Sequence, residues 1–123
     1  MGQIVKIVVG LFLAVHGLIH VTYFVPSDDP RYPMAPARSW LVSRARVPLG
    51  VVRILVRTLA LLAPVGFCLF ALSYLGLLVP SAWFVPLGVV SAVVSLVVIA
   101  ATWNTQFIVG AAIDLGMLIW VLF

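Results

Sequence analysis

The sequence has little charge and few side chains that carry chemistry. Charged residues make up 8% of its 123 positions, and Asp28, Asp29 and Asp114 are its only acidic residues. It has two histidines and one cysteine, Cys68, so no disulfide can form within the chain. It also lacks a glycine-rich phosphate loop, a nucleophile elbow and a CxxC pair. These absences favour a non-catalytic protein over an enzyme.

Apolar residues are what the sequence has in excess. They account for 65% of the chain, well above the share typical of a soluble globular domain. A membrane core roughly 30 Å thick is crossed by about 20 helical residues, because each adds about 1.5 Å. The sequence therefore predicts an all-α polytopic membrane protein, a single domain folded as a bundle of four transmembrane helices. The predicted helices cover residues 4–25, 48–78, 82–102 and 105–123.

The arginines indicate how the chain is oriented in the membrane. All six lie between Arg31 and Arg57, in or beside the one sizeable loop, residues 26–47. Basic loops stay on the cytoplasmic side of membranes. We therefore predict a cytoplasmic loop and, with four spans, both termini outside.

Five ionisable side chains fall inside the predicted helices, where each needs a partner or a role. A charge at the membrane centre costs at least about 2.5–3.5 kcal/mol. They are His16, His20, Arg53, Arg57 and Asp114. Measured from the predicted helix ends, all five lie roughly 8–13 Å from the cytoplasmic side. We predict one polar cluster there, with Asp114 paired to Arg57, the histidines beside them, and Arg53 reaching toward the headgroups.

The histidine pair admits two ligand interpretations and one structural interpretation. Histidines four residues apart share a helix face, so His16 and His20 could hold a transition metal with Asp114 as third ligand. No further histidine completes a tetrahedral site. One histidine could instead bind haem, although bis-histidine ligation within one chain needs histidines on facing helices. The third interpretation is that both are neutral, hydrogen-bonded and orient the helices.

The chain resembles a group of small bacterial four-helix membrane proteins. The resemblance is carried by HGLIH at residues 16–20, SRARVPLG at residues 43–50 and WNTQFIVGAAID at residues 103–114. It covers most of the chain and implies the four-helix fold and a place in the bacterial inner membrane, but no activity. The group usually has asparagine near the position of Asp114, so the carboxylate departs from its pattern and weakens a metal site.

Three functions remain open at this level. The first is a non-catalytic subunit or accessory component of a membrane complex or homo-oligomer, for which Ser91-xxx-Ser95 and Ala112-xxx-Gly116 predict packing faces. The second is a haem- or metal-binding membrane protein that uses the histidine pair. The third is a small oligomeric transporter in which Asp114 takes up and releases a proton or cation. The expected partners are the lipid bilayer and other membrane proteins or further copies. Nucleic acid is not expected, because the anionic inner leaflet accounts for the arginines.

Overall fold

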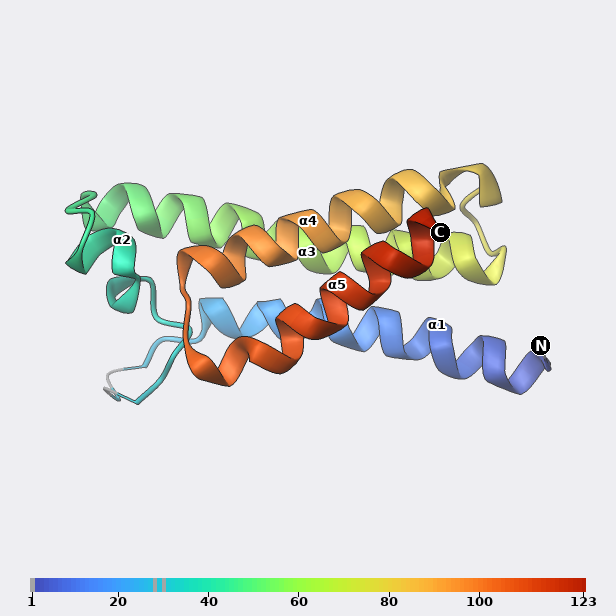
Figure 1. Ribbon diagram of the computed structural model, residues 1–123, viewed down its shortest axis with the longest axis horizontal. Coiled ribbons are helices and arrows are strands. Elements are labelled where there is room, and N and C mark those ends of the chain that lie inside the picture. The colour runs from blue at the N-terminus through green and yellow to red at the C-terminus, as the bar shows by residue number, and fades with distance from the viewer. Residues whose placement is uncertain (1, 28, 30) are drawn as a thin grey trace.

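The computed structural model describes residues 2–27, 29 and 31–123, which fold as a bundle of helices (Figure 1). No strand forms within these residues, so the predicted all-α fold class is confirmed. The α-helices are α1 (Gln3–Leu18), α2 (Trp40–Ser43), α3 (Leu49–Leu75), α4 (Phe84–Ala101) and α5 (Ile108–Leu122). Short 3-10 turns are η1 (Ile19–Phe24), η2 (Pro36–Arg38), η3 (Ser81–Trp83) and η4 (Thr105–Phe107).

Four segments are long and apolar enough to cross a membrane, as in a multi-pass membrane protein. They are Gln3–Phe24, Leu49–Leu75, Ser81–Ala101 and Thr105–Leu122, and their ends lie within three residues of the predicted ends. The first span differs from a uniform α-helix, because α1 tightens into η1 after Leu18. Helix α3 continues through Pro64 without interruption.

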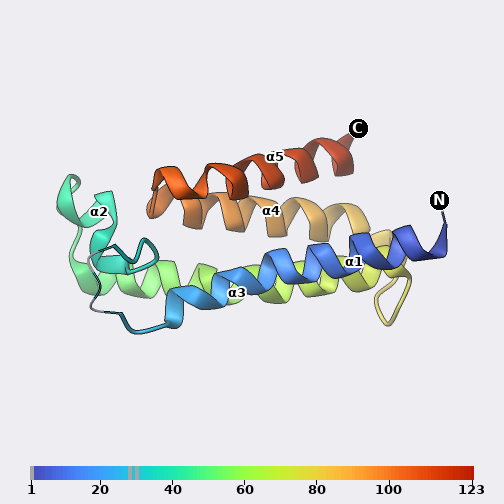
Figure 2. The same ribbon diagram turned by 90° about the horizontal axis from the view of Figure 1, so that it is seen from below.

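The four long helices pack one after another in chain order and do not form a closed ring. Helix α1 packs on α3, α3 on α4, and α4 on α5, whereas α1 and α5 are not a packed pair. Figure 2 shows α1 lying along α3 and α5 lying along α4. Both chain ends lie at one end of the bundle, and α2 with the basic loop lies at the other (Figure 1). The side of the bundle between α1 and α5 is therefore closed by side chains and not by close backbone packing.

Small residues set the spacing of the packed helices. A Cβ atom added to Gly17 of α1 would overlap the Cβ of Phe67 on α3, and one added to Gly66 of α3 would lie 2.5 Å from Ser91 Oγ on α4. The predicted Ser91-xxx-Ser95 face is thus used inside the bundle, where both serines are buried. Gly116 of α5, in contrast, has nothing within 4 Å of an added Cβ and faces outward.

Two apolar clusters form the core. One contains Leu13, Phe67, Phe70, Ala71, Met117 and Val121. The other, nearer the basic loop, contains Tyr23, Val52, Val56, Ala60, Val98 and Ala101. Along α1 and its extension η1, the two histidines fall between the residues of these clusters, and Ser95 precedes Val98 on α4. The two histidines therefore lie between two apolar layers.

Candidate functional site

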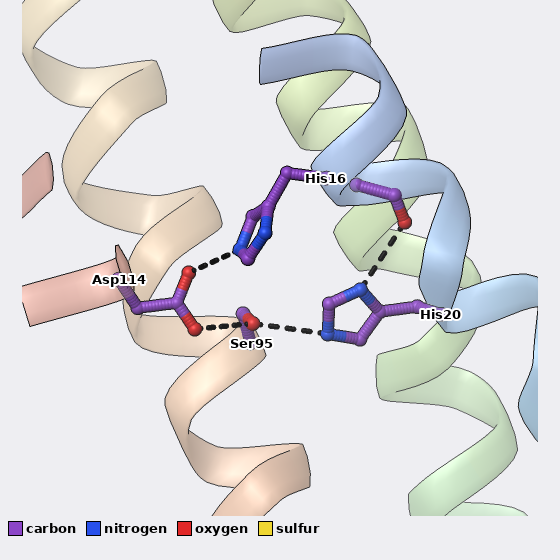
Figure 3. A network of polar contacts seen from close by, with 5 residues as sticks. His16, His20, Ser95 and Asp114 are labelled. Carbon is purple, nitrogen blue, oxygen red and sulfur yellow. Dashed lines mark hydrogen bonds and ion pairs between the residues drawn. The ribbon is translucent and has the colours of Figure 1, made fainter. Parts of the chain in front are cut away.

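Four polar side chains from three spans meet inside the bundle (Figure 3). His16 Nε2 lies 2.8 Å from Asp114 Oδ1. Ser95 Oγ lies 2.5 Å from Asp114 Oδ2 and 2.9 Å from His20 Nε2. His20 Nδ1 in turn lies 3.1 Å from the carbonyl oxygen of Gly17, one turn back along the chain. We refer to His16, His20, Ser95 and Asp114 as the polar network.

The network is almost completely enclosed by protein. Asp114 and Ser95 are 0% exposed, and the exposed fractions of His16 and His20 are 7% and 4%. The ring of Phe67 meets His16 edge-on at a centroid distance of 5.1 Å and stacks on His20 at 6.5 Å. In this low-dielectric setting an unpaired polar group is costly, and an unpaired charge more so. The network must therefore satisfy its hydrogen bonds within itself.

The local sequence explains how the two imidazoles reach the same partners. Residues 16 and 20 share one helix face, and the tighter winding of η1 brings His20 Nδ1 to the carbonyl of Gly17. The absent side chain of Gly17 lets Phe67 pack close beside both rings. Ser95 contributes a side chain small enough to fit between His20 and Asp114.

The hydrogen-bond partners limit which protonation states the polar network can adopt. The Gly17 carbonyl can only accept, so His20 Nδ1 carries a hydrogen. The Ser95 hydroxyl has one hydrogen but contacts both Asp114 Oδ2 and His20 Nε2. If Ser95 donates to Asp114, His20 Nε2 must donate to Ser95, and His20 is an imidazolium. If Ser95 donates to His20, Asp114 must itself be protonated and donate to Ser95.

Both arrangements contain the same number of protons. Each holds one proton more than a carboxylate beside a neutral imidazole would, and each has no net charge when His16 is neutral. They differ only by a shift of two hydrogens along the line from Asp114 through Ser95 to His20. His16 Nε2 donates to Asp114 Oδ1 in both. Either arrangement would satisfy the hydrogen bonds of the network without burying a net charge.

The predicted metal site of His16, His20 and Asp114 does not form as expected. Among the described residues, no group of three or more His, Cys, Asp or Glu side chains is placed to hold a metal ion. The physical reason is that Ser95 lies between His20 and Asp114, while His16 Nε2 is used in its bond to Asp114. A metal needs these lone pairs directed at one common point.

The residues do not fit a haem ligated by both histidines either. An axial ligand needs a ring nitrogen available to the iron, and both ring nitrogens of His20 are engaged, Nδ1 by the Gly17 carbonyl and Nε2 by Ser95. Both histidines also come from one continuous span, Gln3–Phe24, so they cannot face each other across a haem.

The predicted pair of Asp114 with Arg57 is wrong. Asp114 is hydrogen-bonded to His16 and Ser95, and both Arg53 and Arg57 are exposed on α3. The inward face of α3 is formed by Val52 and Val56, which are 0% exposed. Each arginine follows one of these valines by one residue, so it is rotated by about 100° away from the interior. The two arginines share a face, as expected, but it is an outer one.

Ser95 is the network residue whose role the sequence did not reveal. The Ser91-xxx-Ser95 pattern marks it as a small residue at a helix interface. Nothing local distinguishes its hydroxyl from that of Ser91, yet Ser91 Oγ is buried without a hydrogen-bond partner among the described residues. Only the positions of α1 and α5 decide which serine bonds.

Two cavities lie where α1 and α5 fail to pack. One, of about 320 Å³, borders the network and is lined by His16, His20, Tyr23, Met34, Gln106 and Ile113, among others. The other, of about 430 Å³, lies toward the chain ends and is lined by Val9, Phe12, Ile113, Gly116 and Trp120, among others. The polar network therefore borders a mainly apolar cavity.

No protein-family model, curated protein or solved structure matches this chain. The chemistry that the site can perform is therefore inferred from its geometry. That geometry offers hydrogen bonding and proton exchange among the four side chains of the polar network.

Proposed function

We propose that the protein is a small non-catalytic integral membrane protein of the bacterial inner membrane, acting as a subunit or accessory component of a membrane complex or as a homo-oligomer. The observation that carries this proposal is the self-contained polar network. Its hydrogen bonds are satisfied by side chains and one carbonyl of the same chain. Hydrogen bonds within the network fix the positions of α1, α4 and α5 relative to one another.

The proposed orientation places the basic loop in the cytoplasm and both termini outside. Two features support it. The chain ends lie at the opposite end of the bundle from α2 and the loop (Figure 1). Arg31, Arg38, Arg44 and Arg46 all fall within the loop, and basic loops are retained on the cytoplasmic side.

Helix α5 supports assembly with a partner because it is the least covered span. Its close backbone packing is with α4, and 22% of its most apolar window is buried, against 39% for α3 and α4. Ala112 and Gly116 are exposed, Gly116 at the cavity of about 430 Å³ beside α1, and small residues there let another helix approach closely. The proposed contact is therefore between this face and a second membrane helix.

Native mass spectrometry of the protein extracted with its own membrane tests the proposal. We expect a mass above that of one chain, from further copies or another membrane protein. Gly116→Leu should reduce the assembled fraction, because the side chain would hold the partner helix away. Gly50→Leu is the matched control, since an added Cβ there also has nothing within 4 Å. A bare monomer, or equal effects of the two variants, would contradict the proposal.

A second candidate function is proton or cation transport, favoured by the buried carboxyl group of Asp114 and the cavity that adjoins the network. Asp114, Ser95 and His20 form a line along which a proton can shift without leaving a net charge. The test is pH-gradient-driven flux in proteoliposomes. Asp114→Asn should abolish flux while leaving the fold intact, because the amide cannot release a proton. Flux that is absent in the unmodified protein, or unchanged in this variant, removes the candidate.

A further inference from the structure

A second site lies at the loop end of the bundle, away from the polar network. It is a pocket of about 570 Å³, formed by the basic loop and the end of α4. Its lining consists of Arg38, Trp40, Ser43, Arg44, Ala100 and Trp103. Two guanidinium groups, two indoles and one hydroxyl therefore surround the same space.

The pocket wall is anchored to the bundle. Ser39 Oγ donates a hydrogen bond to the carbonyl of Ala101, and Trp40 Nε1 donates to the carbonyl of Ala100 at 2.6 Å. These are carbonyls of the last turn of α4, which lack partners within the helix. Ser39 is 1% exposed and also accepts from the backbone N–H of Leu41 at 3.2 Å. The loop is thus held against α4 with its arginines in place before any ligand binds.

The pocket has an excess of positive charge. Arg38 and Arg44 are exposed, and neither forms an ion pair with a described residue. Arg38 donates one long bond of 3.4 Å, to the carbonyl of Tyr32. The α4 carbonyls would repel an anion, but Trp40 and Ser39 already bond to them. The planar forks of two guanidinium groups match the oxygens of a phosphate.

The tryptophans indicate where the rest of the ligand lies. Trp40 and Trp103 are 42% and 50% exposed, and Trp103 follows the end of the third span by two residues. Tryptophan at a span end lies at the level of the lipid headgroups. The indoles therefore supply apolar surface next to the arginines, at the depth where a phospholipid passes from headgroup to acyl chain.

We propose that this pocket binds the phosphate headgroup of an anionic phospholipid. Arg38 and Arg44 contact the phosphate, and Trp40 and Trp103 pack along the glycerol and the first carbons of the acyl chains. Basic pockets at the ends of transmembrane helices recognise anionic headgroups in this way. The bound lipid would also tie the loop to the end of α4, since both contribute to the pocket.

The test is native mass spectrometry of the purified protein in detergent, titrated with phosphatidylglycerol and separately with phosphatidylcholine. We expect phosphatidylglycerol to bind at least about tenfold more tightly. The double variant Arg38→Gln/Arg44→Gln should lose about tenfold in affinity for phosphatidylglycerol. Arg53→Gln/Arg57→Gln removes the same charge from the exposed face of α3 and should change the affinity by less than about twofold. Thermal unfolding checks that both variants are folded.

Two further measurements separate a lipid from a free phosphate. Inorganic phosphate should not displace phosphatidylglycerol at millimolar concentration, and Trp103→Ala should weaken phosphatidylglycerol binding. Displacement by phosphate, with no effect of Trp103→Ala, would identify a free-phosphate site and overturn the lipid assignment. Equal binding of the two lipids, or equal losses in the two arginine variants, would overturn the proposal as a whole.

Discussion

Asp114 on α5 accepts a 2.8 Å hydrogen bond from His16 on α1, and this bond joins two helices that do not pack directly on each other. Close backbone packing runs from α1 through α3 and α4 to α5, and it is lacking only between α1 and α5 among the neighbouring long helices. Leu13 and Met117 close part of that side through apolar contact in the core. The His16–Asp114 bond is the polar link across it, so the network governs how α5 is held.

Replacing Asp114 by asparagine should leave the protein folded. The oxygen of the introduced amide can accept from His16, and its nitrogen can donate to Ser95, which then donates to His20. The hydrogen-bond pattern of the network is therefore retained. Asp114→Leu has a similar size but leaves these groups unpaired, and we expect a loss of at least about 2 kcal/mol of stability. Thermal unfolding in detergent would measure both. Equal melting temperatures for the two variants would show that the network does not stabilise the fold.

The two buried serines of α4 should respond differently to removal of the hydroxyl. Ser95→Ala leaves Asp114 Oδ2 and His20 Nε2 without their bridge, and we expect a loss of about 1–3 kcal/mol. Ser91→Ala removes a hydroxyl that has no partner among the described residues, so a change within about 0.5 kcal/mol is expected. The ranking of the two unfolding free energies is the test. If Ser91→Ala is the more destabilising variant, the assignment of roles is wrong.

Two glycines should likewise differ when a methyl group is added. In Gly17→Ala the new Cβ overlaps the Cβ of Phe67, which is held by its own backbone, so α1 must move away from α3. We expect destabilisation of about 1–3 kcal/mol, with disturbance of both histidines. Gly116→Ala meets nothing within 4 Å and gains helix propensity, so it should be neutral or stabilising by up to about 1 kcal/mol. Measured melting temperatures in the reverse order would contradict the packing of α1 on α3.

Much of the interior site could be predicted from helix geometry alone. Because each residue advances a helix by about 1.5 Å, the depths of His16, His20 and Asp114 follow from the helix ends, and these residues do meet. The same reasoning placed Arg57 at a matching depth, yet it lies on the outside of α3. Depth is a property of one helix, whereas contact also depends on how that helix is rotated about its axis.

The sequence by itself determined the four spans, the single basic loop and the depths of the polar groups, because run length and residue position are local quantities. Only the tertiary structure decided that Asp114 bonds to His16 and Ser95 and not to Arg57. The spans are apolar on nearly all sides, so polarity leaves their rotation undetermined in lipid, where outer faces are as apolar as inner ones. Close contacts such as that of Gly17 with Phe67 set the rotation, and they exist only after the helices pack.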